Sequence, residues 1–232
     1  VRSSAASDVY KRQEQALSML NTNLDLAITD YVTVDFNAII ECVDLLGGVD
    51  ITITDDEASL MIGYMKELNE LTGHNSTPPA SGGTYTLDGV QACAYARIRY
   101  GGGDDYRRTE RQRTVLTAMM QKAQKSNILT LNKLINAAFG DIQTSFSNTD
   151  LLALATKVFS YDIGDTTGFP YEKTTHKYDK IGDVVIPCDL ASNVTQLHQF
   201  LFNDENYTPS ATVLSNSQQI ISNTGYKQGD GH

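Results

Sequence analysis

The amino-acid sequence predicts an α/β protein, because strand-like and helix-like segments alternate along it. Residues 27–34 are rich in β-branched side chains and partly alternate with polar ones, which predicts a strand. Asp35 can cap a helix over residues 36–46, and a Gly-Gly pair can end that helix. Residues 49–54 predict a second strand. This close succession of strand, helix and strand indicates a βαβ-like unit.

The downstream elements follow from the same kinds of signal. Acidic residues open a predicted helix over residues 55–71, as the helix dipole favours. A further helix starts near Asp88, and we expect it to change to extended chain by Arg97. The sequence also predicts strands over 84–87 and 182–187 and helices over 14–20, 105–125, 128–139, 148–160 and 189–202.

The two ends of the chain differ from its middle. Residues 1–13 are polar, lack periodicity and contain no start methionine, so we expect a non-native or disordered leader. Residues 14–205 are expected to form one domain that lacks its natural beginning. Residues 206–232 turn polar and predict a C-terminal tail that lies on the surface or frays.

Composition excludes some functions and singles out one segment. The formal net charge of −10 argues against a nucleic-acid or anionic-membrane surface as the general mode of binding. No apolar run approaches the roughly 20 residues of a membrane span. The three cysteines favour buried thiols over a disulfide plus one thiol, and the four histidines lack metal-ligand spacing. Every arginine after Arg12 lies between Arg97 and Arg113.

This arginine segment shows two spacings. Arg97 and Arg99 would share a face of an extended strand. Arg108, Arg111 and Gln112 stand at i, i+3 and i+4 of the next predicted helix, on a face that continues into apolar side chains. The segment fits either a charged surface helix, paired with its neighbouring acidic residues, or an anion site.

The anion site rests on the chemistry of the residues around the arginines. Guanidinium groups bind phosphate through paired hydrogen bonds, and a helix N-terminus adds backbone N–H donors. Residues 101–103, three glycines, would let the backbone approach a ligand closely. Several arginines on one ligand indicate more than one negative charge, as in a pyrophosphate. Neither a P-loop nor a Rossmann glycine pattern is present.

The segment YARIRY…DDYRRTERQRTVLTAM resembles the arginine signature of the LytR-CpsA-Psr family. DYVTVDFNAIIECVDLLGGVDI and LDGVQACAYARIRY are similar to two further family segments, and VIPCDLASNVTQLHQFLF matches more weakly. The resemblance covers about residues 14–207. The signature positions matched here are Arg97, Arg99, Asp105, Arg108, Arg111, Gln112 and Val115.

The resemblance implies an extracytoplasmic, membrane-anchored bacterial phosphotransferase, of the Gram-positive type. Such enzymes transfer a glycopolymer, for example wall teichoic acid or capsule, with one phosphate from a polyprenyl pyrophosphate to peptidoglycan. The implied fold is a three-layer α/β/α sandwich with a central mixed sheet, its N-terminal strands missing here. An apolar pocket for the lipid would lie beside the arginines.

The resemblance also implies roles for individual residues. Arg97, Arg99, Arg108 and Gln112 would hold the pyrophosphate and would also stabilise charge on the transferring phosphoryl group; Arg108 is counted among the catalytic residues. Arg111 would either bind phosphate too or only brace the others. Asp105 would be a general base toward the acceptor hydroxyl, or else an N-cap or a residue that orients arginine.

One departure from the family pattern limits these expectations. The membrane anchor and the region that supplies acidic ligands for a divalent cation, expected to be Mg²⁺, are not found in the sequence. We therefore expect a fragment that is inactive alone. A non-catalytic module that binds polyprenyl phosphate or another polyanion is the main alternative. An interaction domain whose arginines pair with an acidic partner is the other.

Overall fold

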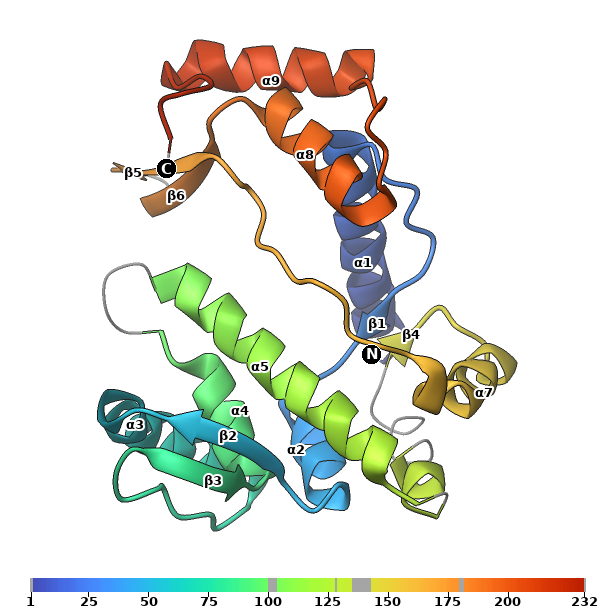
Figure 1. The fold of residues 1–232 in the computed structure, drawn as a ribbon, viewed down its shortest axis with the longest axis vertical. Coiled ribbons are helices and arrows are strands. Elements are labelled where there is room, and N and C mark those ends of the chain that lie inside the picture. Colours follow the sequence, from blue (N-terminus) through green and yellow to red (C-terminus); the bar gives the residue numbers. More distant parts are fainter. Residues whose placement is uncertain (1, 100–103, 128, 135–142, 180–181, 232) are drawn as a thin grey trace. The chain divides into compact units, whose positions relative to one another are not determined.

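The structure is a computed structural model, which describes residues 2–99, 104–127, 129–134, 143–179 and 182–231 (Figure 1). The chain forms two compact units. The central unit is Asp30–Asp165, and the terminal unit combines Val1–Thr29 with Thr166–His232. The sequence predicted one domain over residues 14–205 instead. The polar, Gly- and Pro-containing residues 162–170, around the second boundary, have the composition of a linker, which was a usable signal.

The central unit combines short strands with helices, and the described residues 129–134 are helical as well. In chain order these elements are β1 (Val32–Thr33), α2 (Phe36–Leu45), β2 (Val49–Ile53), α3 (Asp55–Thr72), β3 (Gly83–Leu87), α4 (Gly89–Arg97), α5 (Asp104–Lys125), β4 (Gln143–Thr144), α7 (Asn148–Thr156) and the 3₁₀ turn η1 (Val158–Ser160). The helix predicted over 128–139 lies partly outside the described residues.

Side-chain caps fix where the first helices of the central unit begin. The Asp35 carboxylate accepts the Ala38 N–H at 2.8 Å at the start of α2, as predicted. Asp88 caps α4, also as predicted, and Gln91 completes a capping box there. Thr54 and Glu57 form a second capping box, at the start of α3. Each cap satisfies backbone N–H groups that the helix leaves unpaired.

The described strands form three separate two-stranded antiparallel sheets, β1–β4, β2–β3 and β5–β6. The α/β class is confirmed. The βαβ-like unit is wrong, because β1 and β2 lie in different sheets: Val32 pairs with the distant Thr144, whereas β2 pairs with β3. The described strands therefore make no continuous central mixed sheet.

The main apolar core lies between the β2–β3 sheet and the helices α2 to α5. Strand β2 alternates, with Val49, Ile51 and Ile53 buried and the two residues between them exposed. This alternation is typical of an antiparallel sheet with one solvated face, so the β2–β3 sheet and its helices form two layers rather than three. Further core residues come from the helices: Ile40, Val43, Met61, Met65, Leu68, Val90 and Val115.

Gly89 allows α4 to start in direct contact with α2. A Cβ atom at this position would lie 2.3 Å from the carbonyl oxygen of Ile40. The Gly89 N–H donates to the Asp44 carboxylate at 2.7 Å. Because any larger residue would collide with the α2 backbone, this contact fixes the start of the helix that ends at Arg97.

The terminal unit consists of α1 (Arg2–Leu24), β5 (Lys173–Tyr178), β6 (Gly182–Pro187), α8 (Leu190–Phe202) and α9 (Ala211–Thr224). Its buried apolar cluster is small and centres on Leu190, Val194 and Val213. The predicted strand over 182–187 and the predicted helix over 189–202 are both found. Leu190, Val194 and Leu197 of α8 are buried, whereas Leu201 is half exposed.

Two predictions for the chain ends differ from the structure. Residues 2–13 belong to α1 rather than to a disordered leader, and the stretch contains no glycine or proline that would interrupt a helix. The polar tail contains α9, which Ser210 caps and whose Val213 is fully buried against α8. The sparse apolar residues of α9 lie on one face, and that weak pattern was overlooked.

Candidate functional site

The arginine segment joins the end of α4 to the start of α5 in the central unit (Figure 1). Arg97 is the last residue of α4, and Ile98 caps the helix with extended dihedral angles. The prediction that Arg97 and Arg99 form a pair on one strand face is therefore wrong. The α4 helix continues to Arg97 because buried, helix-compatible alanines occupy its last turns. Residues 100–103 lie outside the described residues.

Arg111 is a buried structural residue. Its Nε donates to the Glu57 carboxylate at 2.8 Å, and its Nη1 donates to the carbonyl oxygen of Ile98 at 3.3 Å. Glu57 also completes the capping box of α3. One guanidinium therefore ties the starts of α3 and α5 to the end of α4. Of the two predicted roles for Arg111, this geometry favours bracing over phosphate binding.

Arg97 occupies a half-buried position among acidic and aromatic side chains. Its Nη2 donates to both carboxylate oxygens of Glu67, at 3.1 and 3.2 Å. Its guanidinium carbon lies 4.7 Å from the ring centroid of Phe36 and 5.5 Å from that of Tyr64, within cation–π range. Among the described residues, its buried Nη1 has no hydrogen-bond acceptor.

The remaining predicted site residues lie closer to solvent. Arg99 and Gln112 are exposed, and Arg108 is half-buried. Arg107, which lies off the face of Arg108 and Arg111, is exposed, whereas Arg113 is half-buried. Asp105 belongs to α5, but its side chain lies outside the described residues, so its predicted roles stay predictions.

The hydrogen bond from Arg111 to the Ile98 carbonyl connects the two halves of the arginine segment, the end of α4 and the start of α5. Ile98 lies between Arg97 and Arg99, and Arg108 lies one helical turn before Arg111. The first turns of α5 are therefore tied to the end of α4 through Arg111. That Arg97, Arg99 and Arg108 face one ligand stays a prediction. Val115 and Ala118 continue the face of Arg111 as buried residues, as the sequence predicted.

Two neutral side chains of α4 complete the surroundings. Burial raises the pKa of Cys93 to about 11, although the positive charge of Arg97 acts in the opposite direction. Burial, and then the negative charge of Glu57, raise the pKa of Tyr95. Both groups stay protonated at neutral pH, so neither is an ionised nucleophile, and the charges of the site come from its arginines and glutamates.

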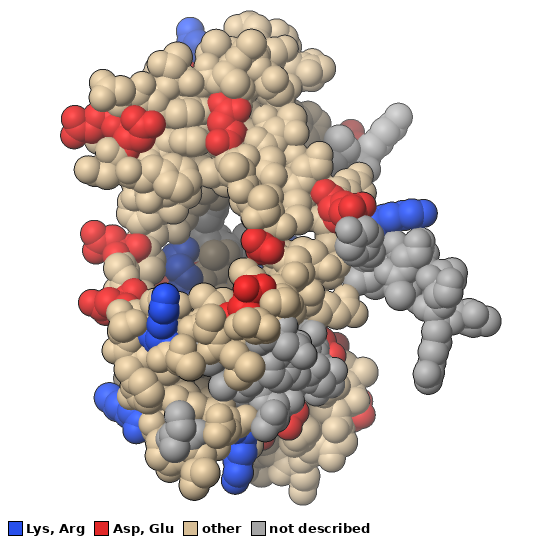
Figure 2. All heavy atoms as spheres, turned by 90° about the vertical axis from the view of Figure 1, so that its right-hand side faces the viewer, with Lys and Arg blue, Asp and Glu red and all other residues tan. Residues whose placement is uncertain are grey.

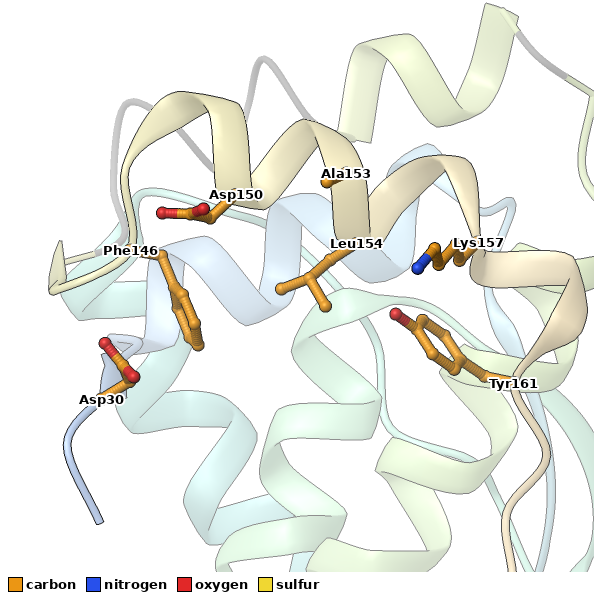
Figure 3. A pocket seen from close by; sticks show the side chains of 7 residues that line it. All are labelled: Asp30, Phe146, Asp150, Ala153, Leu154, Lys157 and Tyr161. Atoms are coloured by element: carbon orange, nitrogen blue, oxygen red, sulfur yellow. The ribbon is translucent and has the colours of Figure 1, made fainter.

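A cavity of about 400 Å³ lies elsewhere in the central unit (Figure 3). Its lining is mixed: Asp30, Phe146, Asp150, Ala153, Leu154, Lys157 and Tyr161. The carbonyl oxygen of Tyr161 accepts from Gln124, near the far end of α5. Gln124 follows Arg111 by 13 residues, which corresponds to about 20 Å of helix. This cavity is therefore not the lipid pocket that was predicted next to the arginines.

The charges, possible metal ligands and helices of the described residues bear on three of the expectations. On the face shown in Figure 2, described basic side chains are scattered among acidic ones and form no continuous basic surface. Within the described ranges no group of three or more His, Cys, Asp or Glu could hold a metal ion. These described residues therefore provide no ligand group for the expected Mg²⁺, which stays a prediction for the whole protein. No described helix has the length and apolar content needed to span a membrane.

Sequence reasoning missed the partners of the two arginines. Glu57 stands three residues after Thr54 in a Thr-x-x-Glu pattern, which marks a capping box, so its helical role was predictable. Its ion pair with Arg111 joins residues 54 positions apart in the chain, so no local sequence pattern indicates it. Glu67, Phe36 and Tyr64 come from α2 and α3, and only the packing of these helices on α4 brings them to Arg97.

Known proteins are similar to this chain in sequence. The chain is 28% identical over 134 residues to Biofilm regulatory protein A of Streptococcus mutans, covering 57% of this chain and 31% of the relative. It is 26% identical over 151 residues to the polyisoprenyl-teichoic acid–peptidoglycan teichoic acid transferase TagV of Bacillus subtilis. This match covers 61% of this chain and 34% of TagV. The chain thus spans about a third of the length of these relatives.

Solved structures agree at the level of the fold. A crystal structure described as a transcriptional regulator from Enterococcus faecalis has a TM-score of 0.66 at 19% identity, covering 93% of this chain and 74% of the other. The structure described as TagT bound to LI-WTA has a TM-score of 0.51 at 20% identity, and the match covers 89% of this chain and 64% of TagT. The sequence profile of the LytR_cpsA_psr family matches residues 9–180. The chain therefore belongs to the LytR-CpsA-Psr family.

Proposed function

We propose that this chain is the phosphate-binding part of a transferase that moves a glycopolymer from a polyprenyl pyrophosphate carrier to peptidoglycan. Family membership and the name of the relative TagV support this class of reaction. The observation that carries the proposal is the hydrogen bond from Arg111 to Ile98. It ties the start of α5, which carries Arg108, to the segment of Arg97 and Arg99. The proposal is that these three cationic side chains bind one small anion.

The proposed reaction is a substitution at phosphorus. The acceptor hydroxyl oxygen forms a bond to the phosphorus that carries the glycan. The bond from that phosphorus to the bridging oxygen breaks, and polyprenyl monophosphate leaves. Arg97, Arg99 and Arg108 would neutralise the charge that develops on the phosphate oxygens, and Gln112 would add a hydrogen-bond donor. Asp105 is our candidate to accept the proton of the hydroxyl group.

Location and cofactor belong to the same proposal. A peptidoglycan acceptor and a lipid-linked donor meet at the outer face of the cell membrane, so we propose an extracytoplasmic, membrane-anchored protein. The expected Mg²⁺ remains a proposal for the whole protein. The described residues offer no group of ligands for it.

Glycopolymer binding without transfer is the second candidate for this chain. The lack of an acidic cluster among the described residues favours it, because phosphoryl transfer usually needs more positive charge than arginine alone provides. Transfer of a labelled glycan phosphate to peptidoglycan distinguishes the two functions. This transfer is expected from the whole protein and not from a module that only binds.

Ligand binding by this chain tests the site directly. Farnesyl pyrophosphate is a soluble probe that carries both the pyrophosphate and an isoprenoid chain. We expect R97A and R108A each to weaken its binding by about tenfold or more, because each removes charge-assisted hydrogen bonds. R107A is the matched control, since Arg107 is an exposed arginine of the same helix. Unchanged binding by both R97A and R108A would rule out the site.

A further inference from the structure

The surroundings of Arg97 hold its guanidinium in place but satisfy its hydrogen-bond donors only in part. Phe36 from α2 and Tyr64 from α3 lie within cation–π distance. Glu67, one turn beyond Tyr64 on α3, binds Nη2 alone through both carboxylate oxygens. The neighbouring Nη1 is buried and finds no acceptor among the described residues. An arginine fork has two outward nitrogens that match an oxyanion, and here one of them is unused.

The carboxylate of Glu67 is a weakly held partner. The Glu67 side chain is 53% exposed, whereas the Arg97 side chain is 23% exposed. Ion pairs with an exposed member contribute little to stability, because water and salt screen them. A phosphate group offers more acceptor oxygens and more charge than a carboxylate. It can therefore replace Glu67 at Nη2 and also supply the acceptor that Nη1 lacks.

We propose that Glu67 is a displaceable counter-ion of Arg97, which sets the affinity and charge selectivity of the anion site. This inference rests on the proposed phosphate-binding function. In the structure the Glu67 carboxylate occupies the place of a ligand oxygen. Binding of a phosphate separates the pair, and the negative charge of Glu67 then lies next to the bound anion and opposes it. Glu67 therefore weakens binding, and the penalty grows with the charge of the ligand.

The contacts of Phe36 and Tyr64 with Arg97 distinguish a displaceable counter-ion from a residue that only positions Arg97. If Glu67 alone oriented Arg97, its neutralisation would release the guanidinium and weaken binding. Phe36 and Tyr64 contact the guanidinium independently of Glu67, so it stays in place when the carboxylate is neutral. We therefore expect that neutralising Glu67 makes phosphate binding tighter, not weaker.

The test compares E67Q with the wild-type chain. Calorimetry with inorganic pyrophosphate should show binding about two- to fivefold tighter in E67Q, the range expected for loss of one screened charge. The gain should be smaller with inorganic phosphate, which carries less charge, and should shrink as salt concentration rises. E70Q is the matched control, because Glu70 is exposed on the same helix and makes no recorded contact with Arg97. It should leave the affinity unchanged.

A double-mutant cycle identifies the cause of any gain. The effect of E67Q should vanish in an R97A background, since it acts through the pair. If R97A weakens pyrophosphate binding but E67Q leaves it unchanged or weaker, Glu67 is not a displaceable counter-ion and the anion site still stands. If neither R97A nor R108A affects binding, the anion site itself is wrong. A gain that persists in the R97A background would also overturn the inference.

Discussion

The central unit and the terminal unit are stabilised by different interactions. The central unit buries a continuous apolar cluster between the β2–β3 sheet and four helices. The apolar cluster of the terminal unit is much smaller. Polar networks join its elements instead, and one of them centres on Asn193, whose side chain is completely buried. Apolar burial tolerates small shifts, but a polar network loses several hydrogen bonds when one member changes.

Two networks of the terminal unit illustrate this difference. The Asn193 amide accepts the N–H groups of Tyr171 and Glu172 and donates to the carbonyls of Glu172, Cys188 and Asp189. In the second network, the Asp25 carboxylate accepts from the Tyr207 hydroxyl and from the N–H and hydroxyl of Ser210. His198 stacks on Tyr207 at 3.7 Å and contacts the Leu24 carbonyl at 2.9 Å.

The largest expected effect is that of N193A. Removing the amide leaves several backbone groups unsatisfied in the interior, so we expect a loss of about 4 kcal/mol in the unfolding free energy. Hydrogen exchange should show the loss in the terminal unit and little change in the central unit. N206A, the same substitution at an exposed position, is the control. Equal deprotection of both units would show that they unfold together.

The next effect concerns the Arg111–Glu57 ion pair in the interior of the central unit. R111A leaves the nearly buried Glu57 carboxylate without its cation and the Ile98 carbonyl without a donor, at a cost of about 3 kcal/mol. Urea unfolding measures this loss. R113A provides the comparison, as it removes a less buried arginine of the same helix. A stable R111A chain that no longer binds pyrophosphate would contradict the bracing role.

Acid should weaken the terminal unit first. Burial raises the pKa of Asp25, but hydrogen bonds from Tyr207 and Ser210 lower it by more, so the net pKa is below normal. The stabilisation is therefore complete above the ordinary Asp pKa, near 4, and is lost as the pH falls through the folded-state value. We expect about 1 kcal/mol, because solvent screens the carboxylate.

The variant D25N tests this pH dependence. Its unfolding free energy should be lower at neutral pH and should change less below about pH 4 than that of the wild-type chain. Hydrogen exchange at several pH values assigns the change to a unit. If D25N kept the full acid sensitivity of the terminal unit, another carboxyl group would be responsible.

The smallest effect is chemical rather than energetic. Burial raises the pKa values of Cys93 in the central unit and Cys188 in the terminal unit, so the reactive thiolate is scarce at neutral pH. Alkylation at pH 7.5 to about 8 should be slow at both residues in the folded chain and fast after unfolding. Mass spectrometry of partly unfolded samples would then show Cys188 labelled before Cys93, if the terminal unit opens first.

Local signals were predictable from the sequence, and long-range pairings were not. Asp35 and Asp88 were identified as caps because an N-cap acts only on the next few residues. The antiparallel pairing of Val32 with Thr144 depends on a partner far along the chain, so the strand near residue 32 was assigned to the wrong sheet. The same limit explains why α9 was missed, since its buried face needs α8.

The candidate site follows the same rule. The spacing of Arg108, Arg111 and Val115 predicted a helix face that becomes buried, and this is confirmed. The spacing could not show which arginine points inward to Glu57 and which one meets Glu67, because both partners come from α3. Arg97 was placed on a strand because its neighbours in the sequence allow an extended chain as readily as a helical end.

The buried Arg111–Glu57 pair has a consequence for how members of this family can diverge. A descendant that gave up its ligand would be free to change Arg97 and Arg108, yet it would still need Arg111 and Glu57 to join three helices. In such a lineage the two paired positions should change together or not at all. In a signature made of several arginines, some positions are therefore kept for folding and others for chemistry. Only the second group, here Arg97 and Arg108, indicates activity.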